Sequence, residues 1–232
     1  DPNNKAKLIQ TWTNNMRDTA GPKVTKSTRV TGYTSIKWSW DCDWFGMKKG
    51  LPQDTLDLLA MHVLNASLLT GLKVTLNGTK LPNKLASYFD LLDGCGTSNI
   101  LKLENDHSRV FVVPSTEFEA ISFVNGIQTK NGGKHVNAWV DAVCRPVIEK
   151  LRGRKSATAS TTLTIKDVKP HFKFLVVTRI PNPEFESQEK NELKTPVKAD
   201  PITSYQVTKI MKWPISETLK GLMLSKEKKQ VT

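Results

Sequence analysis

The run of residues 172–180 is the feature that most constrains how this chain can fold. It is mostly apolar and β-branched and is too short for a surface helix, so it predicts a buried strand. Pro181 and Pro183 then end the strand, because a proline nitrogen cannot donate a ladder hydrogen bond. A polar loop follows as far as Lys190. Loops held at the end of a rigid element commonly carry binding groups.

The residues before this run predict a second strand and a long helix. Residues 118–125 read as a strand, and the helix extends from about His135 to Leu151. Pro146 lies inside that helix and predicts a kink, because it removes one hydrogen bond. The order strand, helix, strand predicts two parallel strands joined by a right-handed crossover. The apolar face of the helix, spaced by threes and fours, consists of Val136, Val140, Val143, Val147 and Leu151.

Shorter elements complete an α+β fold, in which a mixed sheet containing this β-α-β unit is packed by helices and followed by a long C-terminal helix. The predicted strands are 8–12, 33–40, the two arms of a hairpin within 72–81 around Asn77-Gly78, and the pair 100–104 and 109–113. A mobile polar stretch is expected between the first strand and residue 31. The predicted helices are one between Pro52 and Gly71, a short one at 85–92, 205–213 and 216–228, the last with Ser216 as its N-cap.

The charge of the chain limits its partners. Lys and Arg number 34 against 22 Asp and Glu, which gives a net charge of +12 and a pI of about 9.6. Such a surplus favours a polyanionic partner, nucleic acid before membrane. No apolar run is long enough to cross a bilayer, so we expect no membrane partner. The three cysteines form no Cys-x-x-Cys pair, which predicts free thiols in a reducing compartment and no zinc.

The polar loop carries a resemblance to a known family. Residues 182–190 read Asn-Pro-Glu-Phe-Glu-Ser-Gln-Glu-Lys, which resembles the Gln-Thr-Lys loop of type II DNA topoisomerases of the eukaryotic and large-DNA-virus kind. The resemblance implies that Gln188 and Lys190 contact the γ-phosphate of ATP. Glu189 stands where the family has Thr, and an extra carboxylate suits a triphosphate only if it points away. Without the flanking match, a Gln and a Lys in a loop would be typical of solvated surface.

The same resemblance implies that the chain contains parts of two domains. Residues 1–40 resemble the C-terminal strands of the family's ATPase domain, and residues 41–232 resemble its transducer domain, which ends in the helix toward the DNA-cleavage core. ATP and Mg²⁺ would be bound mainly by the ATPase domain, whose magnesium-holding Asn and glycine-rich lid have no counterpart in this sequence. The implied partners are double-stranded DNA, the ATPase domain and cleavage core of the same polypeptide, and a second copy in a homodimer. The implied location is the nucleus for a cellular protein, or the host cytoplasm or nucleus for a viral one.

Residues 121–136 carry the second specific match, Ser-Phe-Val-Asn-x-Ile-x-Thr followed by Gly-Gly-x-His-Val. Gln128-Thr129-Lys130 spells the family's tripeptide here, but outside its context, so we interpret it as a coincidence. Gly132-Gly133 is interpreted as a close-packing site and not as a phosphate cradle. His135 is expected to help fix the helix start without chemistry. We assign no catalytic residue and no metal ligand.

A basic cluster follows the long helix. It consists of Lys150, Arg152, Arg154 and Lys155, and small hydroxylic residues come after it. A flexible cationic cluster suits DNA phosphates, which require charge and little geometry. The family has a lysine-rich loop at this place that faces the cavity for the transported duplex. A merely solvated charged turn is the alternative.

We therefore expect the chain to be the transducer part of an ATP-dependent type II DNA topoisomerase, which senses the γ-phosphate and couples hydrolysis to duplex passage. The alternative is a stand-alone basic domain that binds double-stranded nucleic acid without any link to ATP; nanomolar DNA affinity at physiological salt would favour it. A third reading is a transducer-like domain of gyrase or of a mismatch-repair protein. The Ser187-Gln188 context favours the first.

The first prediction concerns the isolated chain. It has the implied sensor residues without a nucleotide-binding motif, so it should hydrolyse no ATP and relax no DNA. A phosphate-release assay and a plasmid-relaxation assay with ATP and Mg²⁺ check this. Magnesium-dependent turnover by the purified chain would contradict it.

Overall fold

A computed structural model describes residues 1–93, 99–153 and 163–231. The chain divides into two compact units, Asp1–Met61 and His62–Thr232.

The first unit contains one antiparallel hairpin, in which β1 (Ala6–Thr13) pairs with β2 (Asp18–Lys26). The predicted strand at 8–12 is confirmed. The predicted mobile stretch is wrong, because residues 18–26 form β2. Gly21 and Pro22 are rare in regular strands and hid it from the sequence pattern. The ladder accommodates them through a register shift between Ile9 and Thr11.

The strand predicted at 33–40 is also wrong. These residues alternate with period two, but within the described chain they pair with no other strand. Trp38 and Trp40 contact each other instead, with ring centroids 5.0 Å apart, and Trp40 also contacts Phe45 beyond this stretch, with ring centroids 5.8 Å apart. An alternating pattern specifies which faces a strand has, but a strand forms only where a neighbour supplies hydrogen bonds.

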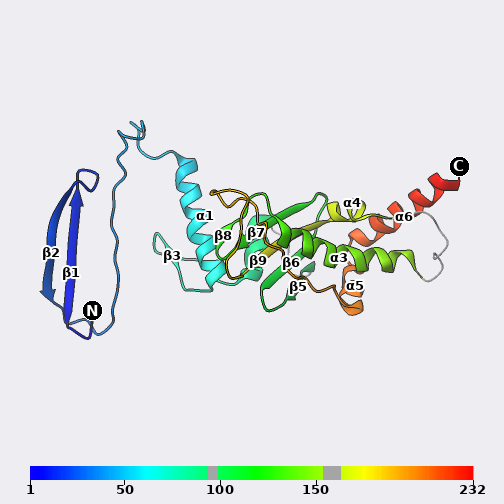
Figure 1. Cartoon of the computed structure of the whole chain (residues 1–232), viewed down its shortest axis with the longest axis horizontal. Coiled ribbons are helices and arrows are strands. Elements are labelled where there is room, and N and C mark those ends of the chain that lie inside the picture. The colour runs from blue at the N-terminus through cyan, green and yellow to red at the C-terminus, as the bar shows by residue number, and fades with distance from the viewer. Residues whose placement is uncertain (94–98, 154–162, 232) are drawn as a thin grey trace. The chain divides into compact units, whose positions relative to one another are not determined.

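The second unit is built on a mixed sheet of order β5-β6-β9-β7-β8 (Figure 1). The strands are β5 (Leu101–Glu104), β6 (Ser108–Pro114), β7 (Glu119–Val124), β8 (Ile127–Gln128) and β9 (Phe172–Thr178). β9 is the central strand; it is antiparallel to β6 and parallel to β7. The chain passes from β7 to β9 through α3 (Lys134–Arg152), so the predicted β-α-β unit and its parallel pairing are confirmed.

Both faces of this sheet are covered. Phe172, Phe174 and Val176 of β9 pack in a core shared with α3, α5 (Ser204–Ile210) and α6 (Ile215–Val231), whereas Leu175 and Val177 pack in a second core on the opposite face. The second core includes side chains from α1 (Gln53–Thr70), the 3₁₀ turn η1 (Leu85–Ser87) and α2 (Tyr88–Asp93). A strand with no solvated face needs apolar side chains at successive positions, which explains the continuous apolar run.

The remaining predicted elements are present, with one correction. They are α1 (Gln53–Thr70), the hairpin β3 (Thr75–Leu76) with β4 (Thr79–Lys80), α2 (Tyr88–Asp93), α5 (Ser204–Ile210) and α6 (Ile215–Val231). Ser216 is not an N-cap, because α6 already begins at Ile215. The backbone N–H of Ser216 donates to the Trp213 carbonyl at 3.0 Å. Pro214 favours this early start, since its fixed φ is already helical.

The sequence reading missed one short helix, α4 (Ile165–Val168), which continues into a 3₁₀ turn, η3 (Lys169–His171). Asp167 of α4 accepts hydrogen bonds from the backbone and hydroxyl of Thr164, both at 2.7 Å, and from Lys226 of α6 at 2.6 Å. Burial works to raise the pKa of Asp167, but these hydrogen bonds outweigh it, so the pKa lies below the ordinary value. Asp167 thereby links α4 to α6.

Pro146 does not end α3, which is one helix through that position. Because proline has no N–H, the carbonyl of Ala142 has no partner one turn ahead. The backbone N–H of Ile202 donates to that carbonyl at 3.1 Å. The proline therefore leaves a helix carbonyl free to bind the segment that leads into α5.

Candidate functional site around Lys190

The chain leaves β9 through a position that Asn125 fixes. The side-chain amide of Asn125 donates to the Ile180 carbonyl at 2.8 Å, and its oxygen accepts from the Ile180 N–H at 3.0 Å. The Asn125 N–H donates in turn to the Thr178 carbonyl at 2.9 Å. Asn125 has φ +50° and precedes Gly126 in the turn between β7 and β8. The Asn125 side chain thus extends the β7–β9 pairing beyond Thr178, the last residue of β9.

Residues 184–195 form a hairpin beyond this exit. Phe185 and Leu193 are paired across it, and the Glu186 N–H donates to the Glu192 carbonyl at 3.0 Å. At the base, the Lys194 N–H donates to the Glu184 carbonyl at 2.8 Å. A hairpin closed by such backbone bonds has a defined tip. We call this segment the 184–195 hairpin.

Gln188 and Lys190 lie at this tip. The Lys190 N–H donates to the Ser187 carbonyl at 3.0 Å, and Lys190 has φ +60°. Gln188 is exposed and Lys190 is partly exposed. In the described part of the chain, neither the Gln188 amide nor the Lys190 ammonium has a hydrogen-bond or ion-pair partner. Both donor groups are available for a ligand.

Four other charged side chains of the hairpin, those of Glu186, Glu189, Glu192 and Lys194, are engaged within it. Glu189 Oε2 accepts a hydrogen bond from the Asn191 amide at 2.6 Å, so this carboxylate is held by its own hairpin. Lys194 lies 2.8 Å from Glu192 and 3.8 Å from Glu186. The Lys194 bond lowers the pKa of Glu192, and the same bond raises the pKa of Lys194. This pairing leaves Lys190 as the unpaired lysine among those of the hairpin.

The hairpin is docked on the start of α3. The Leu193 N–H donates to the Gly132 carbonyl at 3.0 Å, and the Lys134 N–H donates to the Leu193 carbonyl at 2.9 Å. A Cβ on Gly133 would lie 2.4 Å from the Leu193 carbonyl oxygen, and Gly133 has φ +133°. Gly133 therefore packs closely against the Leu193 backbone, which supports the interpretation of the glycine pair as a close-packing site. In Figure 1 the hairpin's trace lies at the end of the sheet near β7 and β8.

A family model described as DNA gyrase B matches residues 85–228, which is more than half of this chain. The chain belongs to the DNA gyrase B family. It is 36% identical over 227 residues to DNA topoisomerase 2 of Invertebrate iridescent virus 6, covering 95% of this chain and 20% of that protein. It is 36% identical over 199 residues to DNA topoisomerase 2-beta of Gallus gallus, covering 82% of this chain and 12% of that protein. The chain thus spans about a fifth or less of the length of these relatives.

A solved structure shows the same fold. The crystal structure of the ATPase region of Saccharomyces cerevisiae topoisomerase II matches with a TM-score of 0.76 and 28% identity, over 95% of this chain and 58% of that chain. The resemblance to type II DNA topoisomerases and the α+β fold class are both confirmed. This family member corresponds to only a part of those isomerases.

The tripeptide Gln128-Thr129-Lys130 begins at the end of β8, and its two outer residues are exposed. Thr129 is buried, its N–H donates to the Ser122 carbonyl at 2.8 Å, and its hydroxyl lies 2.6 Å from that of Ser122. Its central residue is therefore bound inside the fold. This arrangement supports the reading of the tripeptide as a coincidence.

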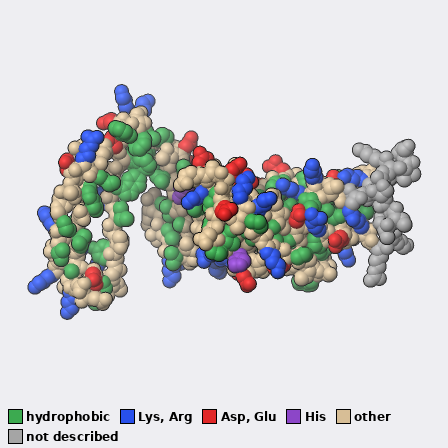
Figure 2. Space-filling model, viewed as in Figure 1, with side chains coloured by type: hydrophobic (Ala, Val, Ile, Leu, Met, Phe, Trp, Pro, Cys, Tyr) green, Lys and Arg blue, Asp and Glu red, His purple; other side chains and the backbone are tan. Residues whose placement is uncertain are grey.

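The basic cluster is only partly within the described residues. Lys150 is exposed in the last turn of α3, and Arg152 donates to the Leu163 carbonyl at 3.4 Å. Arg154 and Lys155 lie outside the described residues. Lys and Arg side chains lie on the visible face toward the C-terminal part of α3 and α6 (Figure 2). Arg152 thus has a structural contact as well as a charge.

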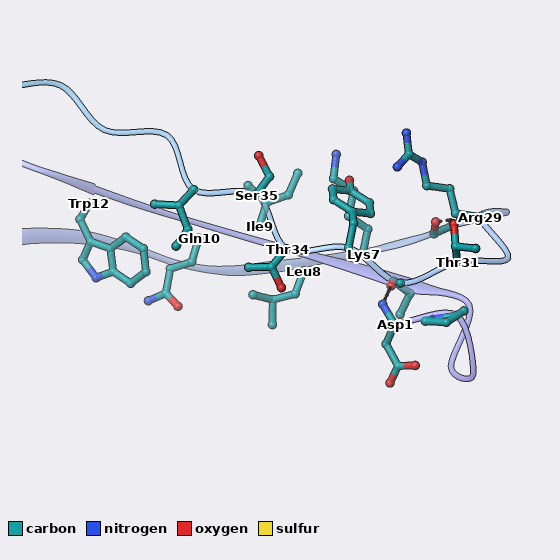
Figure 3. A pocket seen from close by; sticks show the side chains of 16 residues that line it. Asp1, Lys7, Leu8, Ile9, Gln10, Trp12, Arg29, Thr31, Thr34 and Ser35 are labelled. Atoms are coloured by element: carbon teal, nitrogen blue, oxygen red, sulfur yellow. Dashed lines mark hydrogen bonds between the residues drawn. The ribbon is translucent and has the colours of Figure 1, made fainter. Parts of the chain in front are cut away.

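The first unit contains a cavity of about 580 Å³ between β1 and residues 27–36. Arg29 and Thr31 lie at one end, and Trp12 lies at the other (Figure 3). Leu8, Trp12 and Val24 of this hairpin are more than half exposed. None of the predicted site residues lines this cavity. Its charged and apolar groups do not converge on one point, so we assign it no chemistry.

The described residues show neither a metal cluster nor a membrane span. No three His, Cys, Asp or Glu side chains come together there as metal ligands would. No helix within the same ranges is both long and apolar enough to cross a bilayer. Cys42 and Cys144 are free thiols.

His135 is the buried titratable group beside the docked hairpin. It is fully buried, and Nε2 lies 3.4 Å from the Thr129 hydroxyl. Nδ1 has no partner in the described structure. Burial lowers the pKa of His135 from 6.5 to about 4. The imidazole is therefore neutral at pH 7 and supports the helix start by packing.

The second prediction is a pH dependence of stability caused by His135. The unfolded chain binds this proton near pH 6.5 and the folded chain only near pH 4, so protonation favours unfolding. The free energy of unfolding should fall between these pH values, by up to roughly 3 kcal/mol. Urea unfolding from pH 7.5 to 4 measures this. The His135→Gln variant should show a flatter profile, although burial also lowers the pKa of the unchanged His171. Equal slopes in both proteins would contradict the assignment.

Proposed function

We propose that this chain is the transducer part of an ATP-dependent type II DNA topoisomerase. In this proposal it senses the γ-phosphate of ATP and couples hydrolysis to the passage of one DNA duplex through another. The observation that supports it most is the tip of the 184–195 hairpin, where Gln188 and Lys190 offer unpaired donors from a backbone fixed at several points.

The donor groups fit a terminal phosphate. Lys190 would supply an ammonium and Gln188 an amide N–H, and charge-assisted hydrogen bonds to phosphate are about twice as strong as neutral ones. Glu189 does not oppose this, because Asn191 holds its carboxylate. ATP and Mg²⁺ would be bound mainly by an ATPase domain, to which residues 1–40 would contribute strands. When the γ-phosphate is lost, Lys190 loses its partner, and the transducer can rotate against that domain.

Double-stranded DNA is the second partner of this proposal. Lys150, Arg152, Arg154 and Lys155 would contact its phosphates, which fits the net charge of +12. The whole enzyme would act as a homodimer, in the nucleus of a cell or in the nucleus or cytoplasm of a virus-infected host. The stand-alone DNA-binding alternative also explains the charge, but it gives no role to the unpaired groups of the hairpin tip.

The third prediction concerns Lys190→Ala in the full-length enzyme that contains this chain. Loss of a charge-assisted bond, worth about 1.5–3 kcal/mol, should reduce ATP-coupled strand passage by roughly ten- to a hundred-fold. DNA decatenation with ATP measures it. Lys194→Ala is the matched control, because Lys194 is on the same hairpin but is paired with Glu192. Wild-type decatenation and ATPase rates in Lys190→Ala would remove the sensor assignment.

The fourth prediction concerns the basic cluster. Changing Lys150, Arg154 and Lys155 to Gln should weaken DNA binding evenly across sequences and flatten its salt dependence by about 0.9 per lost phosphate contact. Arg152 is kept, because it also bonds the Leu163 carbonyl. Lys7, Lys23 and Lys26 changed to Gln give a control with the same change in charge. Fluorescence anisotropy with duplex DNA over a salt series is the measurement, and an unaltered slope would class the cluster as solvated surface.

A further inference from the structure

We propose that residues 125–134, which connect β7 to α3, are a docking segment that positions Lys190 and passes movement of the 184–195 hairpin to α3. The proposal rests on the proposed function of Lys190 as a γ-phosphate contact. It adds which residues hold Lys190 in place and which helix responds when the hairpin moves.

The docking segment holds the hairpin at two separate anchors. At the first anchor, the side chain of Asn125 binds both backbone groups of Ile180, where the chain leaves β9. At the second anchor, three backbone bonds join the segment to the returning arm of the hairpin. The Asn131 N–H donates to the Asn191 carbonyl at 2.9 Å, and Leu193 exchanges bonds with Gly132 and Lys134. Lys190 lies between these anchors in the chain.

The second anchor depends on the absence of a side chain at Gly133. A Cβ there would lie 2.4 Å from the carbonyl oxygen and 2.5 Å from the nitrogen of Leu193, distances at which backbone atoms must move apart. The Leu193 side chain is fully buried, yet it belongs to neither of the two hydrophobic cores. Leu193 is therefore an anchor of the hairpin and not a part of the sheet's packing.

The docking segment is itself rigidly attached. Thr129 is fixed to Ser122 of β7 through its N–H and its hydroxyl, and the Gly132 N–H donates to the Thr129 carbonyl at 3.0 Å. The next residues are the first turn of α3, in which His135 and Val136 are buried. A displacement of Leu193 therefore acts on the start of α3 directly, through the hydrogen bond from the Lys134 N–H to the Leu193 carbonyl.

The two ends of α3 serve different ligands in this arrangement. The helix has 19 residues, so it is about 28 Å long. Its first turn carries the hairpin, and its last turn carries Lys150 and Arg152 of the proposed DNA contact. The docking segment and α3 thus form a continuous packed connection from the nucleotide contact to the DNA contact. Any coupling between two such sites is reciprocal, so DNA binding would also act on Lys190.

Each anchor can be weakened separately in the full-length enzyme. Asn125→Gly keeps the left-handed turn but removes the side-chain bonds to Ile180. Asn77→Gly is its control, because Asn77 has the same place in an Asn-Gly turn, with φ +49°, and within the described residues makes no hydrogen bond to the 184–195 hairpin. Gly133→Ala forces Leu193 away, and Gly78→Ala is its control, since Gly78 has φ +82° and open space around it. Leu193→Ala weakens the second anchor without backbone strain.

The measurements are the ATPase rate with and without duplex DNA, and amide hydrogen exchange at Ile180, Lys134 and Leu193. Asn125→Gly should raise exchange at the Ile180 amide, whereas Leu193→Ala should raise exchange at the Lys134 and Leu193 amides. Both variants should reduce the stimulation of ATPase by DNA about five-fold or more. The two control variants should retain wild-type stimulation. Combined with Lys190→Ala, the anchor variants should cause no further loss, because they act through Lys190.

The outcomes separate this proposal from the one on which it rests. If Lys190→Ala has no effect, the γ-phosphate assignment itself fails. If Lys190→Ala abolishes stimulation but loosened anchor variants keep it, the docking segment is not the connection. Equal losses in the anchor variants and their controls, or losses that add to that of Lys190→Ala, would show only general destabilisation and would overturn the positioning role.

Discussion

The central position of β9 is the constraint on which the rest of the second unit depends. This strand is hydrogen-bonded on both edges, to β6 and to β7, and is covered on both faces by separate cores. A strand with no free edge and no solvated face cannot shift its register without breaking two ladders and exposing apolar side chains. The point at which the chain emerges, at Ile180, is therefore fixed. The 184–195 hairpin therefore starts from a fixed position.

The hairpin tip shows how a solvated segment can hold a charge in a defined place. Its backbone groups are bonded to one another and to the start of α3, and the side chains of Glu186, Glu189 and Glu192 are engaged by Lys194 and Asn191. These exposed ion pairs add little stability, because solvent screens them. Their effect is instead to occupy the local carboxylates. Within the described residues the Lys190 ammonium is then left without a partner and can bind an external anion.

The sequence predicted most of the second unit because the periodicity of its side chains agrees with the fold. The buried faces of α3, β7 and β9 all appear as apolar patterns, and Asn77-Gly78 marks its hairpin directly. The sequence-based prediction was wrong at two places in the first unit. At 18–26, Gly21 and Pro22 concealed a strand that is present. At 33–40, an alternating pattern predicted a strand, but no neighbouring strand pairs with it in the described chain. The start of α6 was also misplaced at Ser216, since the effect of Pro214 outweighed the preference for a hydroxyl at the N-cap.

Within the candidate site, the sequence by itself determined which side chains are available: Gln188 and Lys190 after a strand, and a cationic cluster after a helix. It also placed them in a family, because those residues lie in a specific order. Only the tertiary structure decided that Asn125 and Leu193 hold the hairpin, and that Gly133 makes room for it. These contacts join residues 55 to 60 positions apart in the chain, and each of them ends on a backbone group of the later segment. Every residue except proline has the same backbone hydrogen-bonding groups, so the pattern of side chains does not reveal which of them pair. The sequence therefore predicted the Lys190 charge but not the contacts that hold it in place.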